Sequence, residues 1–313
     1  MAVYVNTNVS SLNGRRYLNN VQNQLTTTYQ RLSSGLRINS AKDDAAGLQI
    51  SSRLTTQING LNQGNRNASD GVAFAQTAEG AMDEITGMLQ KIRTLAVQAR
   101  NGTNTLDDRK ALGKEATALA QEVTRIAQQT KFAGGQILDG AAGLLTKGGG
   151  NAGKNEIGKL TLQVGANKGD IIDFEIYGMK FSQIASQAGL DKTNDLEKFW
   201  TAGKAQGQNP TQPSITFTKV ENVDIAIASL DKMIGAVDAT RAGLGAIQNR
   251  LESSIRNQAN VSANQADARS RIRDADFAEE SANLSQQSII QQAAASMLMQ
   301  ANTRPQLGLS LLG

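Results

Sequence analysis

The chain reads AQTAEGAMDEITGMLQKIRTLAVQARNG from Ala75 to Gly102, and this stretch decides the fold. Its small and apolar residues recur in alternating steps of three and four, at Ala75, Ala78, Met82, Ile85, Leu89, Ile92, Ala96 and Ala99. That spacing places them on one narrow stripe of an α-helix, as in a coiled-coil seam. The pair Asn101–Gly102 tolerates the left-handed backbone that ends a helix. The stretch therefore predicts a helix that packs against other helices along a seam.

The same spacing extends backwards to Leu54, so the predicted helix has about 55 residues and is roughly 80 Å long. No globular core is that thick, which favours long helices packed side by side. Thr105–Asp108 is a capping box for a third helix that runs to about Lys131. The seam spacing returns between Val223 and Ile255, where Arg241 and Gln248 are polar intrusions that fix the register.

The two ends of the chain each predict one further helix. The N-terminal helix should stop near Ser34–Gly35, and the C-terminal helix should end before Pro305. The predicted seam residues are Leu18, Val21, Leu25, Leu32, Phe277, Leu284, Ile290 and Met297. Both helices are rich in Gln, Asn and Ser, and a lone pair with such thin stripes is marginal in water. We expect the ends to order when they meet other copies, as in an open helical polymer.

The middle of the chain changes character. Apolar residues alternate with polar ones over Leu160–Val164 and again over Ile172–Ile176, with a turn at Gly165–Gly169, which predicts a β-hairpin. Residues 178–220 show no period and are interpreted as a small inserted subdomain or a mobile loop. The predicted fold is mainly α, an elongated antiparallel coiled-coil rod with a small β-hairpin region and a short variable insert.

Composition excludes several classes of function. Aromatic residues make up only 4% of the chain, and it contains no cysteine and no histidine, which removes thiolate chemistry and the commonest general base. The net charge of +4 is spread evenly, so no nucleic-acid stripe is expected. The start of the chain lacks the pattern of a cleaved signal peptide, and no apolar run is long enough for a membrane span.

Two kinds of motif in the sequence could carry chemistry. Residues 148–153 match the pattern GxGxxG, but a hairpin follows where a phosphate-binding helix should begin, so a flexible loop is favoured. The paired carboxylates Asp43–Asp44, Asp107–Asp108 and Glu279–Glu280 each lie near an expected helix start, where capping explains them. No catalytic residue, cofactor or metal is expected.

Three segments carry a resemblance to a known family. Residues 32–47 (LSSGLRINSAKDDAAG) and 272–278 (IRDADFA) are similar to the N- and C-terminal signatures of bacterial flagellins, and 163–167 (QVGAN) to the flagellin hairpin. The resemblance covers about Met1–Ile176 and Val220–Gly313. It implies an inner coiled-coil domain built from 1–43 and 272–313, a rod domain from 44–177 and 221–271, and a variable surface insert at 178–220.

The resemblance also implies a function and partners. The function is that of a structural subunit, which polymerises with itself into the flagellar filament for motility. The subunit would be secreted without a cleaved signal through the flagellar export apparatus. Its partners would be an export chaperone, a filament cap protein and hook–filament junction proteins. In many flagellins a vertebrate innate receptor reads three residues of the rod, and the matching positions here are Lys91, Leu95 and Glu115. Lys91 stands where the family pattern has Arg, which loses bidentate bonding.

Three other classes of protein share some of these features. A hook–filament junction protein has similar ends and would differ in phenotype. A flagellin with a peptidase in its insert needs a histidine-containing zinc motif, which a chain without histidine cannot supply. A secreted coiled-coil adhesin or effector would explain the heptads but not both signatures.

Overall fold

The computed structural model describes residues 7–140, 145–148, 157–190, 196–201 and 213–310. The chain divides into two compact units. Unit 1 comprises Met1–Asn59 with Val261–Gly313, and unit 2 comprises Gly60–Asn260. Helices α2 (Ala45–Arg100) and α6 (Val220–Arg273) each run from one unit into the other. The fold is mainly α-helical, as predicted, and all the strands of the described residues belong to unit 2.

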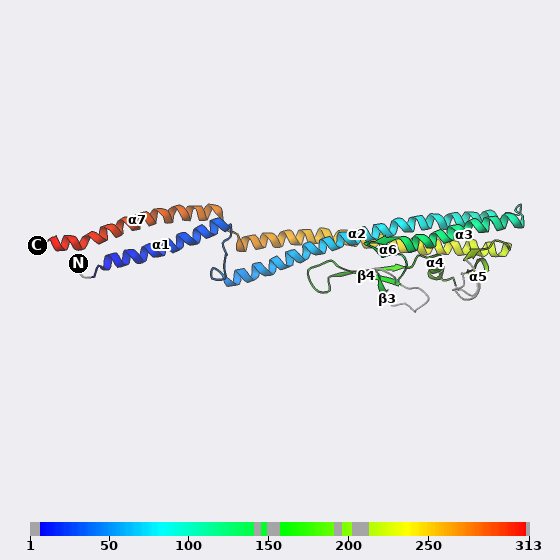
Figure 1. The fold of residues 1–313 in the computed structure, drawn as a ribbon, viewed down its shortest axis with the longest axis horizontal. Coiled ribbons are helices and arrows are strands. Elements are labelled where there is room, and N and C mark those ends of the chain that lie inside the picture. The colour runs from blue at the N-terminus through cyan, green and yellow to red at the C-terminus, as the bar shows by residue number, and fades with distance from the viewer. Residues whose placement is uncertain (1–6, 141–144, 149–156, 191–195, 202–212, 311–313) are drawn as a thin grey trace. The chain divides into compact units, whose positions relative to one another are not determined.

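Two antiparallel helices, α1 (Val9–Ser34) and α7 (Phe277–Ser310), lie side by side in unit 1 (Figure 1). The Asn8 side chain caps α1 by accepting a hydrogen bond from the Ser11 amide at 3.0 Å. Gly35 ends α1 in the left-handed region, with φ of 70°, as the sequence predicts.

The expected end of the last helix was wrong. Helix α7 continues through Pro305 to Ser310. A proline ring removes one backbone hydrogen bond from a helix interior, and that loss does not end the helix here.

Three helices form the framework of unit 2. Helix α2 has 56 residues, close to the predicted length. Helix α3 (Leu106–Gln129) begins with the predicted capping box, in which the Thr105 side chain accepts from the Asp108 amide and Asp108 accepts from the Thr105 amide. The predicted seam residues of α2, from Ala75 to Ala99, are fully buried and share one core cluster with residues of α3 and α6.

Side-chain pairs set the antiparallel register of α2 and α6 within unit 2. Arg93 pairs with Asp231 and Arg100 pairs with Asp224, each with an N–O distance of 2.6 Å. The step from Arg93 to Arg100 is one heptad along α2, and the step from Asp231 to Asp224 is one heptad back along α6. Constant register over successive heptads is the mark of an antiparallel coiled-coil seam.

The two polar intrusions of α6 have the predicted role. The Arg241 guanidinium contacts the Asp83 carboxylate at 2.9 Å, and the Gln248 amide donates to Glu79 at 2.9 Å. Both bonds join α6 to α2, so they extend the register fixed by the arginine–aspartate pairs.

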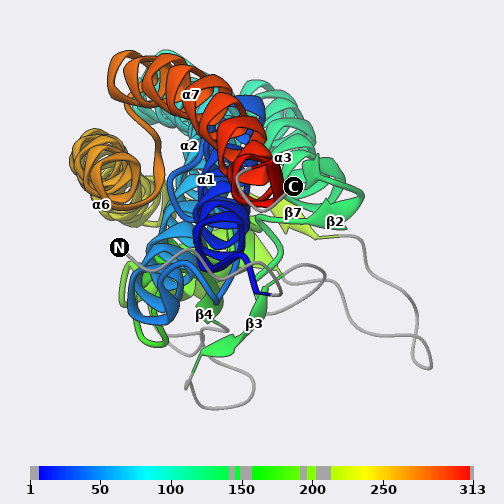
Figure 2. The same ribbon diagram turned by 90° about the vertical axis from the view of Figure 1, so that its left-hand side faces the viewer.

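In the part of unit 2 that the structure describes, three small sheets accompany the helices. The largest contains β3 (Thr146–Gly148), β4 (Ile157–Gln163) and β5 (Ile171–Tyr177) in antiparallel order. It lies to one side of the helices (Figures 1 and 2). Strands β1 (Lys131–Phe132) and β2 (Gly135–Gln136) form a second pair.

The predicted hairpin is the β4–β5 pair, with Leu160 opposite Phe174. Phe174 is fully buried, and its ring meets Phe74 of α2 edge-on at a centroid distance of 5.7 Å. The hairpin is therefore anchored to the helices by an aromatic contact.

The described part of 178–220 is packed into the core. It contains α4 (Phe181–Gln187), α5 (Leu196–Phe199), β6 (Trp200–Thr201) and β7 (Ser214–Ile215). Phe181, Trp200 and Phe217 are buried in it, and the Phe181 and Trp200 rings lie 4.5 Å apart. Of the two interpretations of this stretch, the described residues match an ordered subdomain and not a mobile loop. The bulky aromatic side chains account for this order, because their burial stabilises a segment whose sequence has no repeating pattern.

Candidate assembly surface

The connection between α1 and α2 pairs with the chain that enters α7. The Arg37 amide donates to the Arg273 carbonyl at 2.7 Å, and the Ala275 amide donates to the Gly35 carbonyl at 3.0 Å. These bonds form a β-bridge between Leu36 and Asp274. We call this contact the clip. It joins the two signature segments, which are far apart in the sequence, within unit 1.

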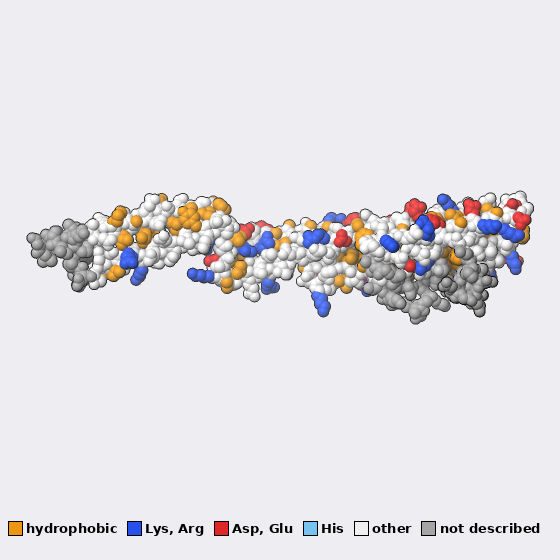
Figure 3. Space-filling view, in the orientation of Figure 1, with side chains coloured by type: hydrophobic (Ala, Val, Ile, Leu, Met, Phe, Trp, Pro, Cys, Tyr) orange, Lys and Arg blue, Asp and Glu red, His pale blue; other side chains and the backbone are white. Residues whose placement is uncertain are grey.

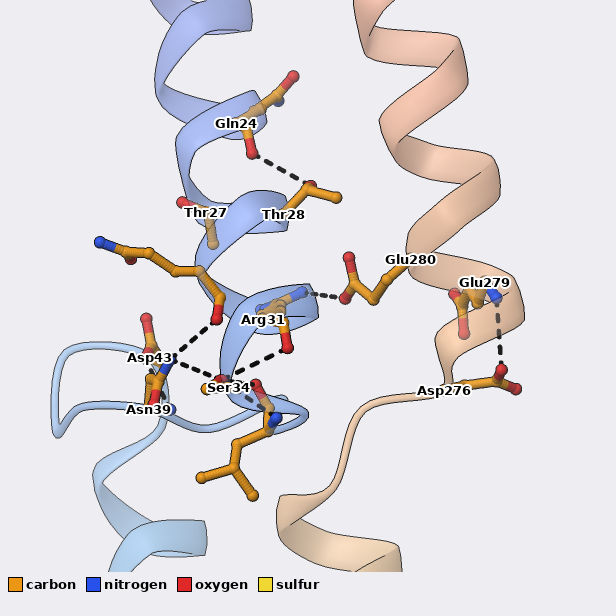
Figure 4. Close-up of polar contacts among 12 residues, drawn as sticks. Gln24, Thr27, Thr28, Arg31, Ser34, Asn39, Asp43, Asp276, Glu279 and Glu280 are labelled. Carbon is orange, nitrogen blue, oxygen red and sulfur yellow. Dashed lines mark hydrogen bonds and ion pairs between the residues drawn. The ribbon is translucent and has the colours of Figure 1, made fainter.

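Asp43 folds the loop that precedes α2. Its carboxylate accepts hydrogen bonds from the Ser40 amide at 2.8 Å, the Asn39 amide at 3.1 Å and the Ser40 hydroxyl at 3.1 Å. The amide of Ser40, followed by that of Asn39, lowers the pKa of Asp43 below its ordinary value. The Asn39 side chain in turn donates to the Ser34 hydroxyl at 2.9 Å (Figure 4). The loop is thus tied to the end of α1.

The first turn of α2 explains the Asp44–Gly47 part of the signature. Asp44 caps the helix by accepting from the Gly47 amide at 2.9 Å. A Cβ at Gly47 would lie 2.5 Å from the Asp44 carboxylate and 2.7 Å from the Ile38 side chain. Ile38 is only 3% exposed, so a larger residue at this position would force the Asp44 and Ile38 side chains to shift. The cap and the close approach together hold the clip against α2.

Polar contacts run along the α1–α7 pair. The Arg31 guanidinium contacts the Glu280 carboxylate at 2.9 Å, with side chains 33% and 9% exposed respectively (Figure 4). Thr28 donates to Gln287 at 3.2 Å. Near the other end, the Asn8 side chain donates to the Ala301 carbonyl at 2.8 Å. The pair is held by a few polar contacts together with a thin apolar strip.

The predicted seam residues divide into two groups. Val21 is 4% exposed, and five others are partly buried: Leu18, Leu25, Leu32, Leu284 and Ile290. Phe277 and Met297 are 60% and 68% exposed, so the contact between α1 and α7 leaves most of each residue uncovered. The spacing of three and four residues could not separate the two groups. Residues with this spacing lie on neighbouring faces of one side of the helix, and α7 or α1 covers only some of those faces.

Unit 1 also exposes apolar side chains that are not among the predicted seam residues. Six large ones on α1 and α7 are more than half exposed: Val9, Leu12, Tyr17, Tyr29, Ile289 and Met299. With Phe277 and Met297 they form the exposed apolar set. Figure 3 shows hydrophobic side chains gathered along this helix pair with few charged ones among them. In the sequence the signal is the run 281–303, which contains no charged residue. Large exposed apolar areas mark interaction surfaces.

The three predicted receptor contacts lie in unit 2. Lys91 and Leu95 are on α2 and Glu115 is on α3. Lys91 and Glu115 are exposed, and Leu95 is partly buried against the core. No ion pair of the described residues joins Lys91 to Glu115. Their role as receptor contacts stays a prediction.

Three further points concern the loop motif, metal binding and membrane spans. Most of the GxGxxG match at 148–153 lies outside them. Within the described ranges, no cluster of three or more acidic, histidine or cysteine side chains could hold a metal ion. None of the helices there is both long and apolar enough to cross a membrane.

Comparison with known proteins decides the family. The model of the bacterial flagellin N-terminal helical region matches residues 5–142, and that of the C-terminal helical region matches 227–312. Flagellin A of Vibrio anguillarum is 38% identical, and Flagellin B of Vibrio cholerae is 36% identical, each over the whole of both chains. The chain belongs to the bacterial flagellin family. Its function is therefore that of a structural subunit of the flagellar filament.

A solved structure assigned to a flagellar hook-associated protein of Vibrio parahaemolyticus is also similar. Its TM-score is 0.53 at 13% identity, covering 74% of this flagellin chain and all of that one. An identity this low shows a shared fold alone. The alternative of a hook–filament junction protein is not favoured, because the flagellin relatives match over the full length.

Proposed function

We propose that the chain polymerises through unit 1, by burying the exposed apolar set of α1 and α7 against neighbouring copies. The observation that carries this proposal is the exposure of Phe277 and Met297, at 60% and 68%, on a helix pair whose intramolecular contact is thin. Burying a side chain of this size stabilises an interface by roughly 1.5–3 kcal/mol. A head-to-tail arrangement that does not close on itself extends into a helical filament.

The proposed domain layout assigns a place to each part of the chain. Residues 1–43 and 272–313 form the inner layer of the filament, and 44–177 with 221–271 form the rod outside it. Residues 178–220 face the filament surface. The two units divide within α2 and α6, at Asn59–Gly60 and Asn260–Val261, whereas the proposed layers divide at the ends of those helices.

Export and assembly partners follow from the same proposal. The chain leaves the cell through the flagellar export apparatus. An export chaperone binds the C-terminal part, a cap protein folds each subunit at the filament tip, and junction proteins join the filament to the hook. The chain carries no enzymatic activity, which agrees with a family of structural proteins.

The free subunit is proposed to be recognised by a vertebrate innate receptor through Lys91, Leu95 and Glu115. Exposure of Lys91 and Glu115 supports this proposal. The alternative role of these residues is a filament contact, and one surface can serve both.

Seeded polymerisation of the purified chain, viewed by electron microscopy, tests the proposal. Wild-type protein added to short filament seeds should extend them. A variant that ends at Ile272 lacks α7 and should not. Failure of the wild type to extend seeds, or extension by the truncated chain, would contradict assembly through unit 1. A junction protein would form short caps on the hook in place of long filaments.

A further inference from the structure

The methionines of the described residues fall into two classes by exposure. One class is buried in the core of unit 2 or packed against it, and its members are Met82, Met88, Met179 and Met233. The other class is Met297 and Met299, which lie in the uncharged run of α7 and are 68% and 67% exposed. Among the described methionines, these two present their thioether groups to solvent in the folded subunit.

Met297 and Met299 flank the contact that α7 makes with α1. Leu298, between them, lies against Gly14 of α1, because a Cβ built at Gly14 would be 3.2 Å from the Leu298 Cδ1 atom. Successive residues of a helix are turned by about 100°, so the two methionines point to opposite sides of this contact. A chemical change at the two sulfur atoms therefore alters the outer flanks of the helix pair and leaves the contact between Leu298 and Gly14 in place.

An exposed thioether is a site of oxidation by peroxides. The sulfur atom takes one oxygen atom from hydrogen peroxide, the O–O bond breaks, and the peroxide is reduced to water by the two electrons that the sulfur loses. The product is a polar sulfoxide, which sulfoxide reductases return to the thioether. The chain has no cysteine that would compete for the oxidant, and its single tryptophan, Trp200, is buried. The two exposed methionines are therefore the side chains that we expect a peroxide to oxidise first.

We propose that Met297 and Met299 form a reversible oxidation site that determines whether a free subunit can enter the filament. This inference rests on the proposed polymerisation through unit 1. Both side chains are two-thirds exposed in the free subunit, so their oxidation leaves its fold intact. In the filament the same side chains are buried by neighbouring copies, and a sulfoxide oxygen buried there loses its hydrogen bonds to water. The reduced subunit thus assembles, the oxidised one does not, and a subunit already in the filament is shielded from the oxidant.

Peptide mass spectrometry combined with seeded growth tests the site. Purified monomer is treated with hydrogen peroxide, freed of the reagent, and divided between peptide mapping and addition to filament seeds. Sulfoxide should form at Met297 and Met299 before it forms at the methionines of the unit 2 core, because susceptibility follows exposure. The critical concentration for seeded growth should then rise about tenfold. In finished filaments the two positions should oxidise at least about tenfold more slowly. Unchanged growth of the doubly oxidised monomer, or equal oxidation rates in monomer and filament, would overturn the proposal.

Substitution by leucine separates these two methionines from every other site of oxidation. Met297→Leu with Met299→Leu removes both sulfur atoms and keeps side chains of similar volume. The quantity compared is the critical concentration after peroxide divided by that of the same protein before it, so any effect of the substitution itself cancels. This ratio should be about ten for the wild type and within about twofold of one for the leucine variant. The matched control, Met88→Leu with Met233→Leu, keeps the exposed pair and should respond as the wild type does.

The remaining outcomes distinguish this inference from the proposed function. Treatment of the oxidised wild type with a methionine sulfoxide reductase should restore its growth, and growth that stays lost after both sulfoxides are reduced would contradict a reversible site. A leucine variant that loses growth as the wild type does would remove Met297 and Met299 from the site. Untreated wild type that fails to extend seeds would instead overturn the proposed function itself.

Discussion

Two identical substitutions in α2 should have opposite effects on the stability of unit 2. Gly64 is buried, and a Cβ built there would lie 2.2 Å from the Val164 carbonyl oxygen and 2.7 Å from the Val164 carbonyl carbon. Gly80 lies in the same helix and has nothing within 4 Å of a Cβ. In both cases alanine gains helix propensity of roughly 1 kcal/mol over glycine.

A contact between the new methyl group and the backbone determines whether alanine stabilises or destabilises unit 2. At Gly64 the new methyl group meets the turn of the β4–β5 hairpin, which cannot rotate away as a side chain would. Overpacking of this kind costs about 1–3 kcal/mol or more. We expect Gly64→Ala to destabilise unit 2 by up to about 2 kcal/mol after the propensity gain. Gly80→Ala should stabilise it by roughly 0.5–1 kcal/mol.

Thermal unfolding followed by circular dichroism distinguishes the two variants. A change of 1 kcal/mol shifts the midpoint by about 2–4 °C in a domain of this size. Gly64→Ala should therefore melt several degrees below the wild type, and Gly80→Ala slightly above it. Equal or raised midpoints for both variants would refute the close packing of α2 against the hairpin turn.

Three further predictions concern unit 1 and the receptor contacts. Glu280→Gln should lower the free energy of unfolding by about 1–2 kcal/mol, measured by chemical denaturation, because the charge-assisted bond to the one-third-exposed Arg31 is lost. The control Asp107→Asn, at the exposed ion pair with Lys110, should not change that free energy measurably. Asp43 has a lowered pKa in the folded state, so its contribution is present above the ordinary aspartate pKa of about 4 and is lost as the pH falls through the folded value. The stability difference between wild type and Asp43→Asn should therefore be present at pH 7 and vanish in acid; a difference that persists in acid would contradict this assignment. Leu95→Ala should reduce receptor signalling by the monomer, and unaffected signalling would remove that residue from the contact.

Features that a repeating spacing or a local hydrogen bond encodes could be predicted from the sequence. The long helix α2, the capping box of α3 and the β4–β5 hairpin all follow from spacing and turn residues. The seam spacing also identifies Arg241 and Gln248 as register-setting residues, and both contact α2.

Features that depend on contacts distant in sequence were not predicted. The clip pairs Leu36 with Asp274, and no local pattern signals a single β-bridge between such separate segments. The burial of Trp200 and Phe217 could not be read from an aperiodic stretch. Phe277 and Met297, predicted as assembly-seam residues, are exposed within the chain, and their burial by other copies stays a prediction. The spacing of apolar residues along a helix does not show which neighbouring element covers them.

Assembly through the exposed apolar set is tested most directly by the critical concentration for seeded growth of Phe277→Ser with Met297→Ser. The two side chains are 60% and 68% exposed, so their loss should leave the folded monomer as stable as the wild type. Losing two buried contacts in the filament should raise the critical concentration at least tenfold, since about 1.4 kcal/mol corresponds to one factor of ten. Leu106→Ser, which removes a 49% exposed apolar side chain from unit 2, is the control. An unchanged critical concentration for the double variant would contradict polymerisation through unit 1.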